Sequence, residues 1–249
     1  MKLFITLTVF AIVLNACGNK EKKEITQQEL SAPTAQLTEE QIANGWRLLF
    51  DGQTTKGWQI FKGRENNTWE VDEGTLHCKP LKEGVAGDGD QRSDIMTTEE
   101  FENFKLTFDW KITPEANSGV MFRVTEEFEQ PYYSGPEYQV VDDKGYPGEL
   151  NDTQLTAATF DMYGTVNQSV RPIGEWNTSK LVVNDNHVEH WLNGSKVLEY
   201  ELGSADWIKR KNECKWKDAV GYGMAKKGHI DIQDHGSEVW YKNIMIRIL

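Results

Sequence analysis

Apolar and polar residues alternate in short segments through most of the chain. The clearest alternation covers residues 104–112, where Phe, Leu, Phe, Trp and Ile are separated by Lys, Thr, Asp and Lys. A period of two indicates a strand with one buried face and one face in solvent. We therefore predict that residues 104–112 form a strand over a hydrophobic core.

Similar segments recur between turn residues. The turn at 114–118, Gly135-Pro136 and the hairpin signal Asn193-Gly194 each precede a candidate strand. Strands are expected at residues 119–124, 137–141, 180–183, 188–192, 195–200, 229–233 and 239–248. Helical periodicity is weak and confined to 97–101 and 204–209, with a capping-box spacing between Thr38 and Gln41.

Many short strands with few helices predict an all-β fold, a jelly-roll sandwich of two antiparallel sheets. Residues 46–249 have a length typical of one all-β domain. All nine tryptophans lie in this range, where they supply an aromatic core or a surface for a ligand.

The first residues predict export. Lys2 precedes an apolar segment, 3–14, which is too short to span a bilayer as a helix. The following Asn15-Ala16-Cys17 resembles a bacterial lipobox, which implies removal of the signal peptide 1–16 and lipidation of Cys17. An ordinary signal peptide with an incidental cysteine is the alternative.

Residues 17–45 lack aromatic residues and are predicted to be a flexible stalk. A lipoprotein of the cell envelope is therefore expected, periplasmic or in the outer membrane, with membrane contact through its anchor only. The net charge of −12 argues against nucleic acid as a partner.

Cysteine and acidic residues leave several questions open. Cys78 and Cys214 could form a disulfide or remain thiols. No zinc-ligand spacing occurs, and no cofactor is required by the sequence. The acidic turns at 142–143 and 88–90 could bind calcium, although such turns are usually only turns.

Polar side chains share faces of the predicted strands. By a period of two, Arg123 shares a face with Met121, and Glu137 shares one with Gln139. Other polar residues on such faces are Asp109, Lys111, His229, Asp231, Gln233 and His235. Neighbouring strands would bring these side chains into one groove, whereas the alternative is an ordinary solvated sheet face. Aromatic rings for sugar stacking could come from Tyr163, Trp176 and Trp191, unless they pack in the core.

Seven segments in order resemble the bacterial 3-keto-disaccharide hydrolase domain, formerly a domain of unknown function. They are 48–53 with 57–58, 117–123, 135–143, 163–164, 174–177, 190–194, and 230–236 with 239 and 242–244. The resemblance implies a concanavalin A-like jelly roll that acts on glycosides whose C3 hydroxyl a partner sugar oxidoreductase has oxidised to a ketone. That ketone acidifies the C2 hydrogen, so that proton removal expels the glycosidic oxygen and water then adds.

This chemistry requires a base, an electrophile and an acid. We assign the base to His235 or Glu137. Arg123, or a divalent cation held partly by Glu137, is predicted to stabilise the enolate. Gln139, Asn117 and Gln233 are expected to orient hydroxyl groups, Trp191 to contact the sugar, and Tyr163 or Asp109 to act as the acid.

Three other functions compete with this hypothesis. A non-catalytic, lipid-anchored carbohydrate-binding module would bind a sugar without cleaving it. An ordinary glycosidase would need two carboxyl groups about 5–10 Å apart, for which Glu137 and Asp109 are the candidate pair. An adhesion domain has no positive feature in the sequence.

Overall fold

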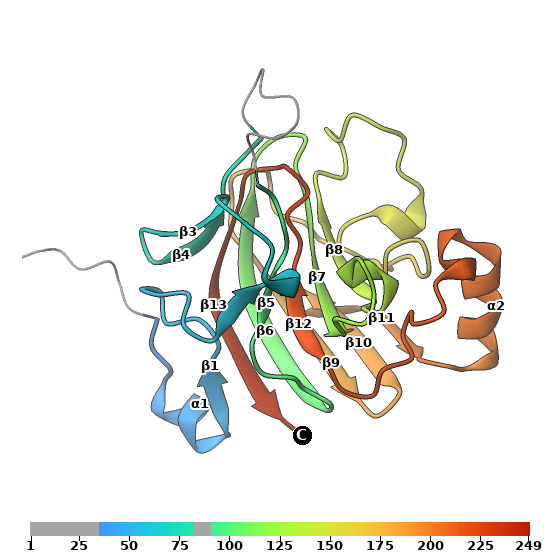
Figure 1. Cartoon of the computed structure of the whole chain (residues 1–249), viewed down its shortest axis with the longest axis horizontal. Coiled ribbons are helices and arrows are strands. Elements are labelled where there is room, and N and C mark those ends of the chain that lie inside the picture. The colour runs from blue at the N-terminus through green and yellow to red at the C-terminus, as the bar shows by residue number, and fades with distance from the viewer. Residues whose placement is uncertain (1–34, 82–90) are drawn as a thin grey trace, which may run out of the picture. The chain divides into compact units, whose positions relative to one another are not determined.

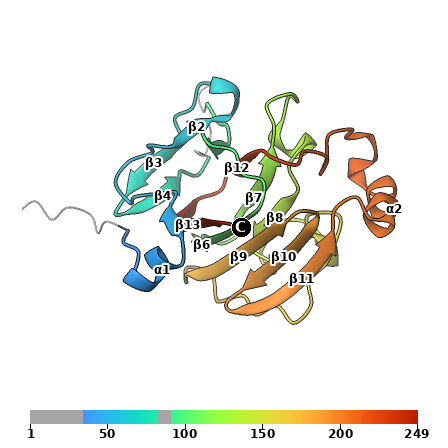
Figure 2. The ribbon, with the colours of Figure 1, turned by 90° about the horizontal axis from the view of Figure 1, so that it is seen from below.

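The computed structural model describes residues 35–81 and 91–249, which belong to one compact unit. Two antiparallel β-sheets pack face to face in this unit, as Figures 1 and 2 show. This arrangement confirms the predicted all-β sandwich. The proposed signal peptide, Cys17 and the acidic turn at 88–90 lie outside the described residues, so those assignments stay predictions.

The larger sheet has the strand order β11-β10-β9-β6-β13-β4-β3, and β1 pairs with β13 beside this path. Its strands are β1 (Trp46–Leu48), β3 (Trp69–Asp72), β4 (Thr75–Cys78), β6 (Phe104–Ile112), β9 (Asn177–Asn184), β10 (His187–Leu192), β11 (Ser195–Glu201) and β13 (Val239–Ile248). The predicted 104–112 strand is central, because β6 pairs with both β13 and β9.

The smaller sheet has the order β2-β5-β12-β7-β8. Its strands are β2 (Trp58–Ile60), β5 (Ile95–Thr97), β7 (Asn117–Val124), β8 (Glu137–Val141) and β12 (His229–Ile232). The short strands β1 to β5 were not predicted, because three or four residues are too few to show a period. The weak helical signal at 97–101 was wrong, since Thr97 ends β5 and no helix follows.

The core lies between the inward faces of the two sheets. All five apolar residues of β6 are at most 2 % exposed. From the smaller sheet, Phe122 and Tyr138 are fully buried against them. Full burial of one such side chain contributes about 1.5–3 kcal/mol. The polar groups are paired, since Ser179 Oγ accepts from Trp110 Nε1 at 2.9 Å and lies 2.8 Å from the Tyr138 hydroxyl.

Helices are few and peripheral. In Figures 1 and 2, α1 (Glu39–Ala43) and α2 (Ala205–Glu213) lie at opposite ends of the sheets. Residues 35–81 and 91–249 also contain four short 3₁₀ helices, which are η1 (Phe61–Gly63), η2 (Pro131–Tyr133), η3 (Asp152–Gln154) and η4 (Lys215–Asp218). No helix in the described part of the chain is long and apolar enough to cross a membrane.

The α1 helix corrects one predicted boundary. Thr38 and Gln41 form the expected capping box. The backbone N–H of Ala35 donates to the Asp51 carbonyl at 3.2 Å. Residues 35–45 are therefore folded onto the sandwich, and the globular unit begins before Trp46.

Candidate functional site

A row of side chains crosses the outward face of the smaller sheet. Asp231 on β12 pairs in register with Met96 on β5 and with Met121 on β7. Met121 in turn pairs with Glu137 on β8. Because residues paired in register share a face, the sheet brings Asp231 and Glu137 onto the face opposite the core.

A cavity of about 330 Å³ opens over this row, and we call it the Glu137 pocket. Its size is at the lower end of the range of about 300–1,000 Å³ for small-molecule sites. It is lined by Tyr132, Tyr133, Glu137, Lys215, Trp216, Gln233 and His235. These residues come from η2, β8, η4 and the segment after β12, so four separate parts of the chain build the pocket.

Glu137 is the most enclosed acid of the pocket, with 4 % of its surface exposed. Loss of hydration raises the pKa of Glu137 to about 8, although the positive charge of Lys215 opposes this rise. The side-chain amide of Gln139, oriented to satisfy its neighbours, donates to Glu137 Oε1 at 3.0 Å and to the Ser118 carbonyl at 3.2 Å. Glu137 is therefore a protonated carboxylic acid at neutral pH.

Lys215 supplies the amino group of the pocket. Its Nζ lies 3.9 Å from the ring centroid of Phe160 and 4.3 Å from that of Trp216. Loss of hydration lowers the pKa of Lys215, opposed by the negative charges of Glu137 and Asp161. The position of the backbone is fixed, because the Lys215 N–H donates to Asp161 Oδ2 at 3.0 Å.

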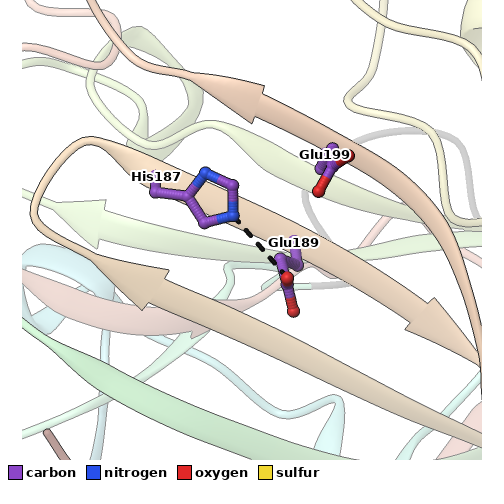
Figure 3. Close-up of side chains that lie close together, drawn as sticks. All are labelled: His187, Glu189 and Glu199. Carbon is purple, nitrogen blue, oxygen red and sulfur yellow. Dashed lines mark ion pairs between the residues drawn. The ribbon is translucent and has the colours of Figure 1, made fainter.

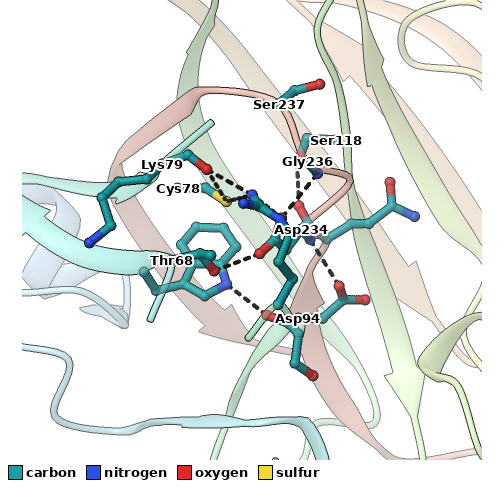
Figure 4. A network of polar contacts seen from close by, with 12 residues as sticks. Thr68, Cys78, Lys79, Asp94, Ser118, Asp234, Gly236 and Ser237 are labelled. Carbon is teal, nitrogen blue, oxygen red and sulfur yellow. Dashed lines mark hydrogen bonds and ion pairs between the residues drawn. The ribbon is translucent and has the colours of Figure 1, made fainter. Parts of the chain in front are cut away.

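His235 is exposed, and its neighbours Asp234 and Gly236 belong to the polar network in Figure 4. The Asp234 carboxylate accepts from Arg92 Nε at 2.9 Å, from Thr68 Oγ1 at 2.6 Å and from the Gly236 N–H at 3.1 Å. Loss of hydration, together with the charge of Lys215, lowers the pKa of His235 below 6.5. The imidazole is therefore neutral at neutral pH.

Two further carboxyl groups lie near Glu137. Loss of hydration raises the pKa of Asp94 to about 7, with a contribution from Asp234. Asp231 is fully buried, and its pKa is also raised, first by burial and then by Asp94 and Glu137. Neither Asp231 oxygen has a hydrogen-bond partner among the described residues. Of these two acids, Asp94 reinforces the raised pKa of Glu137 by repulsion.

Arg123 does not reach the Glu137 pocket, which corrects its predicted position. Its φ of 55° interrupts the alternation of β7, where the register with β12 also shifts. Val124 consequently shares the outward cluster with Met121. The Arg123 Nη2 instead donates to the carbonyls of Asp185 at 2.6 Å and Glu102 at 3.3 Å. A period of two fails here because the strand contains a bulge.

Three other candidates also lie away from the pocket. Asp109 is on the larger sheet and accepts from Thr178 Oγ1 at 2.7 Å, so it is not the predicted carboxylate partner of Glu137. Tyr163 stacks on Tyr200 with ring centroids 4.8 Å apart. Trp191, on β10, has Lys180 Nζ 3.5 Å from its ring centroid. Strand alternation alone could not show which part of the fold contains each of these three residues.

The three predicted amides differ in their positions. Gln233 lines the pocket, and its Oε1 has no hydrogen-bond partner in the described part of the chain. Gln139 is 1 % exposed and supports Glu137 instead of facing the cavity. Asn117 lies at the start of β7, and its N–H donates to Ser237 Oγ at 2.9 Å. Of the three, Gln233 is the one that lines the pocket.

Sequence reasoning missed Lys215, Trp216 and the two tyrosines of η2. These residues lie in 3₁₀ helices, which have no extended period to mark a face. The local pattern Lys-Trp-Lys at 215–217 was the only signal, a cation beside an aromatic ring. Such a pair is common on ordinary surfaces.

The two cysteines and the acidic turn at 142–143 are candidates that lie outside the Glu137 pocket. Cys78 and Cys214 are free thiols. Asp142 Oδ1 accepts the N–H of Gly145 at 2.9 Å, and Asp143 Oδ1 accepts that of Thr156 at 2.7 Å. The Asp142 carboxylate thus closes a local turn, whereas that of Asp143 joins two segments that are 13 residues apart.

One group among the described residues has metal-ligand spacing, and Figure 3 shows it on the larger sheet. It consists of His187, Glu189 and Glu199. Lys196 Nζ pairs with both glutamates, at 3.3 Å from Glu189 Oε1 and 2.5 Å from Glu199 Oε2. Both carboxylates of the group therefore already have a cationic partner within the protein. A cation held by Glu137 stays a prediction.

The chain is similar to known proteins over nearly its whole length. It is 32 % identical over 276 residues to a 3-keto-disaccharide hydrolase of Bacteroides thetaiotaomicron, covering 95 % of this chain and 94 % of that protein. A crystal structure from Parabacteroides distasonis, of a protein provisionally described as a glycosyl hydrolase, has a TM-score of 0.79 and 37 % identity. It covers 87 % of this chain and 100 % of that one.

A second crystal structure from Parabacteroides distasonis shares the fold, with a TM-score of 0.62, 23 % identity and coverage of 83 % and 100 % of the two chains. The model of the 3-keto-alpha-glucoside-1,2-lyase-like domain matches residues 45–247. That match includes every strand of both sheets except the final residue of β13. The chain therefore belongs to the 3-keto-alpha-glucoside-1,2-lyase-like domain family.

Proposed function

We propose that this protein cleaves the glycosidic bond of 3-keto-glycosides in the Glu137 pocket. One observation carries the proposal: the pocket combines an acid whose pKa is raised with an imidazole whose pKa is lowered. Two groups shifted in opposite directions are the arrangement that acid–base catalysis requires. The similarity to a 3-keto-disaccharide hydrolase supports the same substrate class.

Each step has a candidate residue. The neutral imidazole of His235 removes the C2 proton of the sugar, whose acidity comes from the ketone at C3. The side chain of Lys215 stabilises the negative charge that develops on the C3 oxygen. The protonated carboxyl of Glu137 gives its proton to the departing glycosidic oxygen. Water then adds at C1, which completes hydrolysis. A sugar oxidoreductase has to supply the C3 ketone.

The proposal predicts strict dependence on the ketone. We expect the purified protein to release monosaccharide from a 3-keto-disaccharide and none from the same disaccharide before oxidation, because only the ketone acidifies the C2 hydrogen. Release is measured by chromatography, and binding of both sugars is measured by calorimetry. Binding of the 3-keto sugar without release would favour a carbohydrate-binding module. Equal cleavage of both sugars would contradict elimination and favour an ordinary glycosidase.

The pH dependence of cleavage follows from the two pKa shifts. The rate should rise as the pH rises through the pKa of His235, below 6.5, because the base must lose its proton. It should fall as the pH rises through the pKa of Glu137, about 8, because the acid must keep its proton. The measurement is kcat/KM against pH, which reports the free enzyme. A rate that continues to increase well above pH 8 would remove Glu137 from the acid role.

A further inference from the structure

We propose that Nζ of Lys215 condenses with the C3 ketone of the sugar, so that the reaction proceeds through a covalent iminium. This inference rests on the proposed function, because only an oxidised sugar brings a carbonyl into the Glu137 pocket. It makes Lys215 a nucleophile of the reaction as well as an electron sink.

The surroundings of Lys215 leave its amine available. Among the described residues, Nζ has no hydrogen bond and no ion pair, and its close neighbours are the rings of Phe160 and Trp216. The residue lines the cavity and remains open to solvent, so a ligand can reach it. An amine without an acceptor in a partly desolvated aromatic site is the environment in which lysine acts as a nucleophile.

Burial acts on Glu137 and Lys215 in opposite directions. It raises the pKa of Glu137 to about 8 and lowers the pKa of Lys215, while the charge of each group opposes the shift of the other. Loss of hydration thereby increases the share of neutral amine above that of an ordinary lysine. The same pair supplies a nucleophile and a proton donor in one pocket.

The backbone at Lys215 is held firmly in place. Its own N–H donates to Asp161 Oδ2 at 3.0 Å. The neighbouring Trp216 donates from Nε1 to the Phe160 carbonyl at 2.9 Å and stacks on Tyr222 with ring centroids 4.6 Å apart. The only freedom left to Lys215 is that of its four-carbon side chain. Attack on a bound carbonyl therefore needs little reorganisation of the backbone.

The covalent route begins with the attack of the Lys215 amine on the ketone. Nζ attacks C3, the carbonyl oxygen leaves as water, and a protonated iminium forms between C3 and Nζ. Removal of the C2 proton by His235 gives an enamine, which expels the C1–O electron pair onto the leaving sugar as Glu137 protonates that oxygen. Water adds at C1, C2 regains a proton, and a second water hydrolyses the iminium. The net reaction consumes one water and frees the Lys215 amine.

Reductive trapping tests this inference. Wild-type protein incubated with a 3-keto-glucoside and cyanoborohydride should gain the mass of one reduced sugar adduct, and peptide mapping should place it on Lys215. Lys215→Arg keeps a cation but cannot form an iminium, so it should show no adduct and lose at least 100-fold in cleavage, about the effect of one catalytic group. Lys217→Arg, on the same 3₁₀ helix but outside the pocket, should trap normally.

The outcomes separate this inference from the proposed function. Cleavage by Lys215→Arg near the wild-type rate, or cleavage by wild type with no adduct at Lys215, would overturn the iminium and leave the proposed function standing. An adduct at Lys215 without cleavage would support the nucleophile and overturn the proposed function. Neither cleavage nor an adduct would overturn both. Loss of an adduct through misfolding is detected by circular dichroism of each variant.

Discussion

Replacement of Glu137 with glutamine is expected to reduce kcat/KM for a 3-keto-disaccharide by about 10²- to 10⁴-fold, the range for loss of a general acid. Glutamine has the size of a protonated glutamate, and Glu137 is protonated at neutral pH because burial raises its pKa to about 8. The fold and substrate binding should therefore persist. The measurement is steady-state cleavage, together with calorimetric binding of the same sugar.

A matched control for this variant is Glu175→Gln, which changes an exposed glutamate in the turn before β9. It should cleave at the wild-type rate. The residual activity of Glu137→Gln should also lose its decline at alkaline pH, since the group that causes the decline is gone. If Glu137→Gln instead keeps half of the wild-type kcat/KM, the leaving oxygen receives its proton from another group.

Alanine at position 119 is expected to cost about 10²-fold in kcat/KM, the effect of displacing a catalytic group by about 1 Å. Gly119 lies on β7 beneath the Glu137 side chain. A Cβ at this position would stand 2.0 Å from Glu137 Oε1 and 2.7 Å from its Cδ. Because such contacts are forbidden, the carboxyl group has to move out of its place in the pocket.

Gly148→Ala is the control, since its Cβ would approach no atom closer than 3.4 Å, at Tyr146 Cε1. We expect it to retain full activity. In the Glu137→Gln background, Gly119→Ala should add little, because the group that it displaces is already inactive. An unchanged rate in a folded Gly119→Ala protein would mean that the position of the Glu137 carboxyl is not important for cleavage.

The position of Gly119 also explains why the motif at 117–123 contains a glycine. The sequence 117–123 contains a glycine in the middle of a central strand, where glycine normally weakens the sheet. In the structure Gly119 pairs in register with Gln139, and the Glu137 side chain occupies the space above it. The strand therefore gives up some intrinsic stability so that a carboxylic acid can be buried against its backbone.

The sequence alone determined the architecture and part of the site. Alternation at 104–112 identified the central strand of the larger sheet, because its nine residues show the period of two clearly. The same reasoning placed Glu137 and His235 among the candidates, and both line the pocket. For Glu137 the inference holds because β8 is a regular strand, in which side-chain direction follows from position, whereas His235 lies beyond the end of β12.

Tertiary structure decided which of the candidates meet. Arg123 points away from the pocket because its own φ of 55° reverses the alternation of side chains along the strand. The pattern of polar residues in the sequence does not reveal such a local bulge. Asp109 lies on the larger sheet, whereas Glu137 lies on the smaller one. Strand order depends on long-range pairing, which a local period in the sequence does not encode. Lys215 lines the same pocket as Glu137 from a 3₁₀ helix distant in the sequence, and this contact also depends on long-range packing. Periodicity fixes the face of a strand, whereas only the packed chain fixes which faces share a pocket.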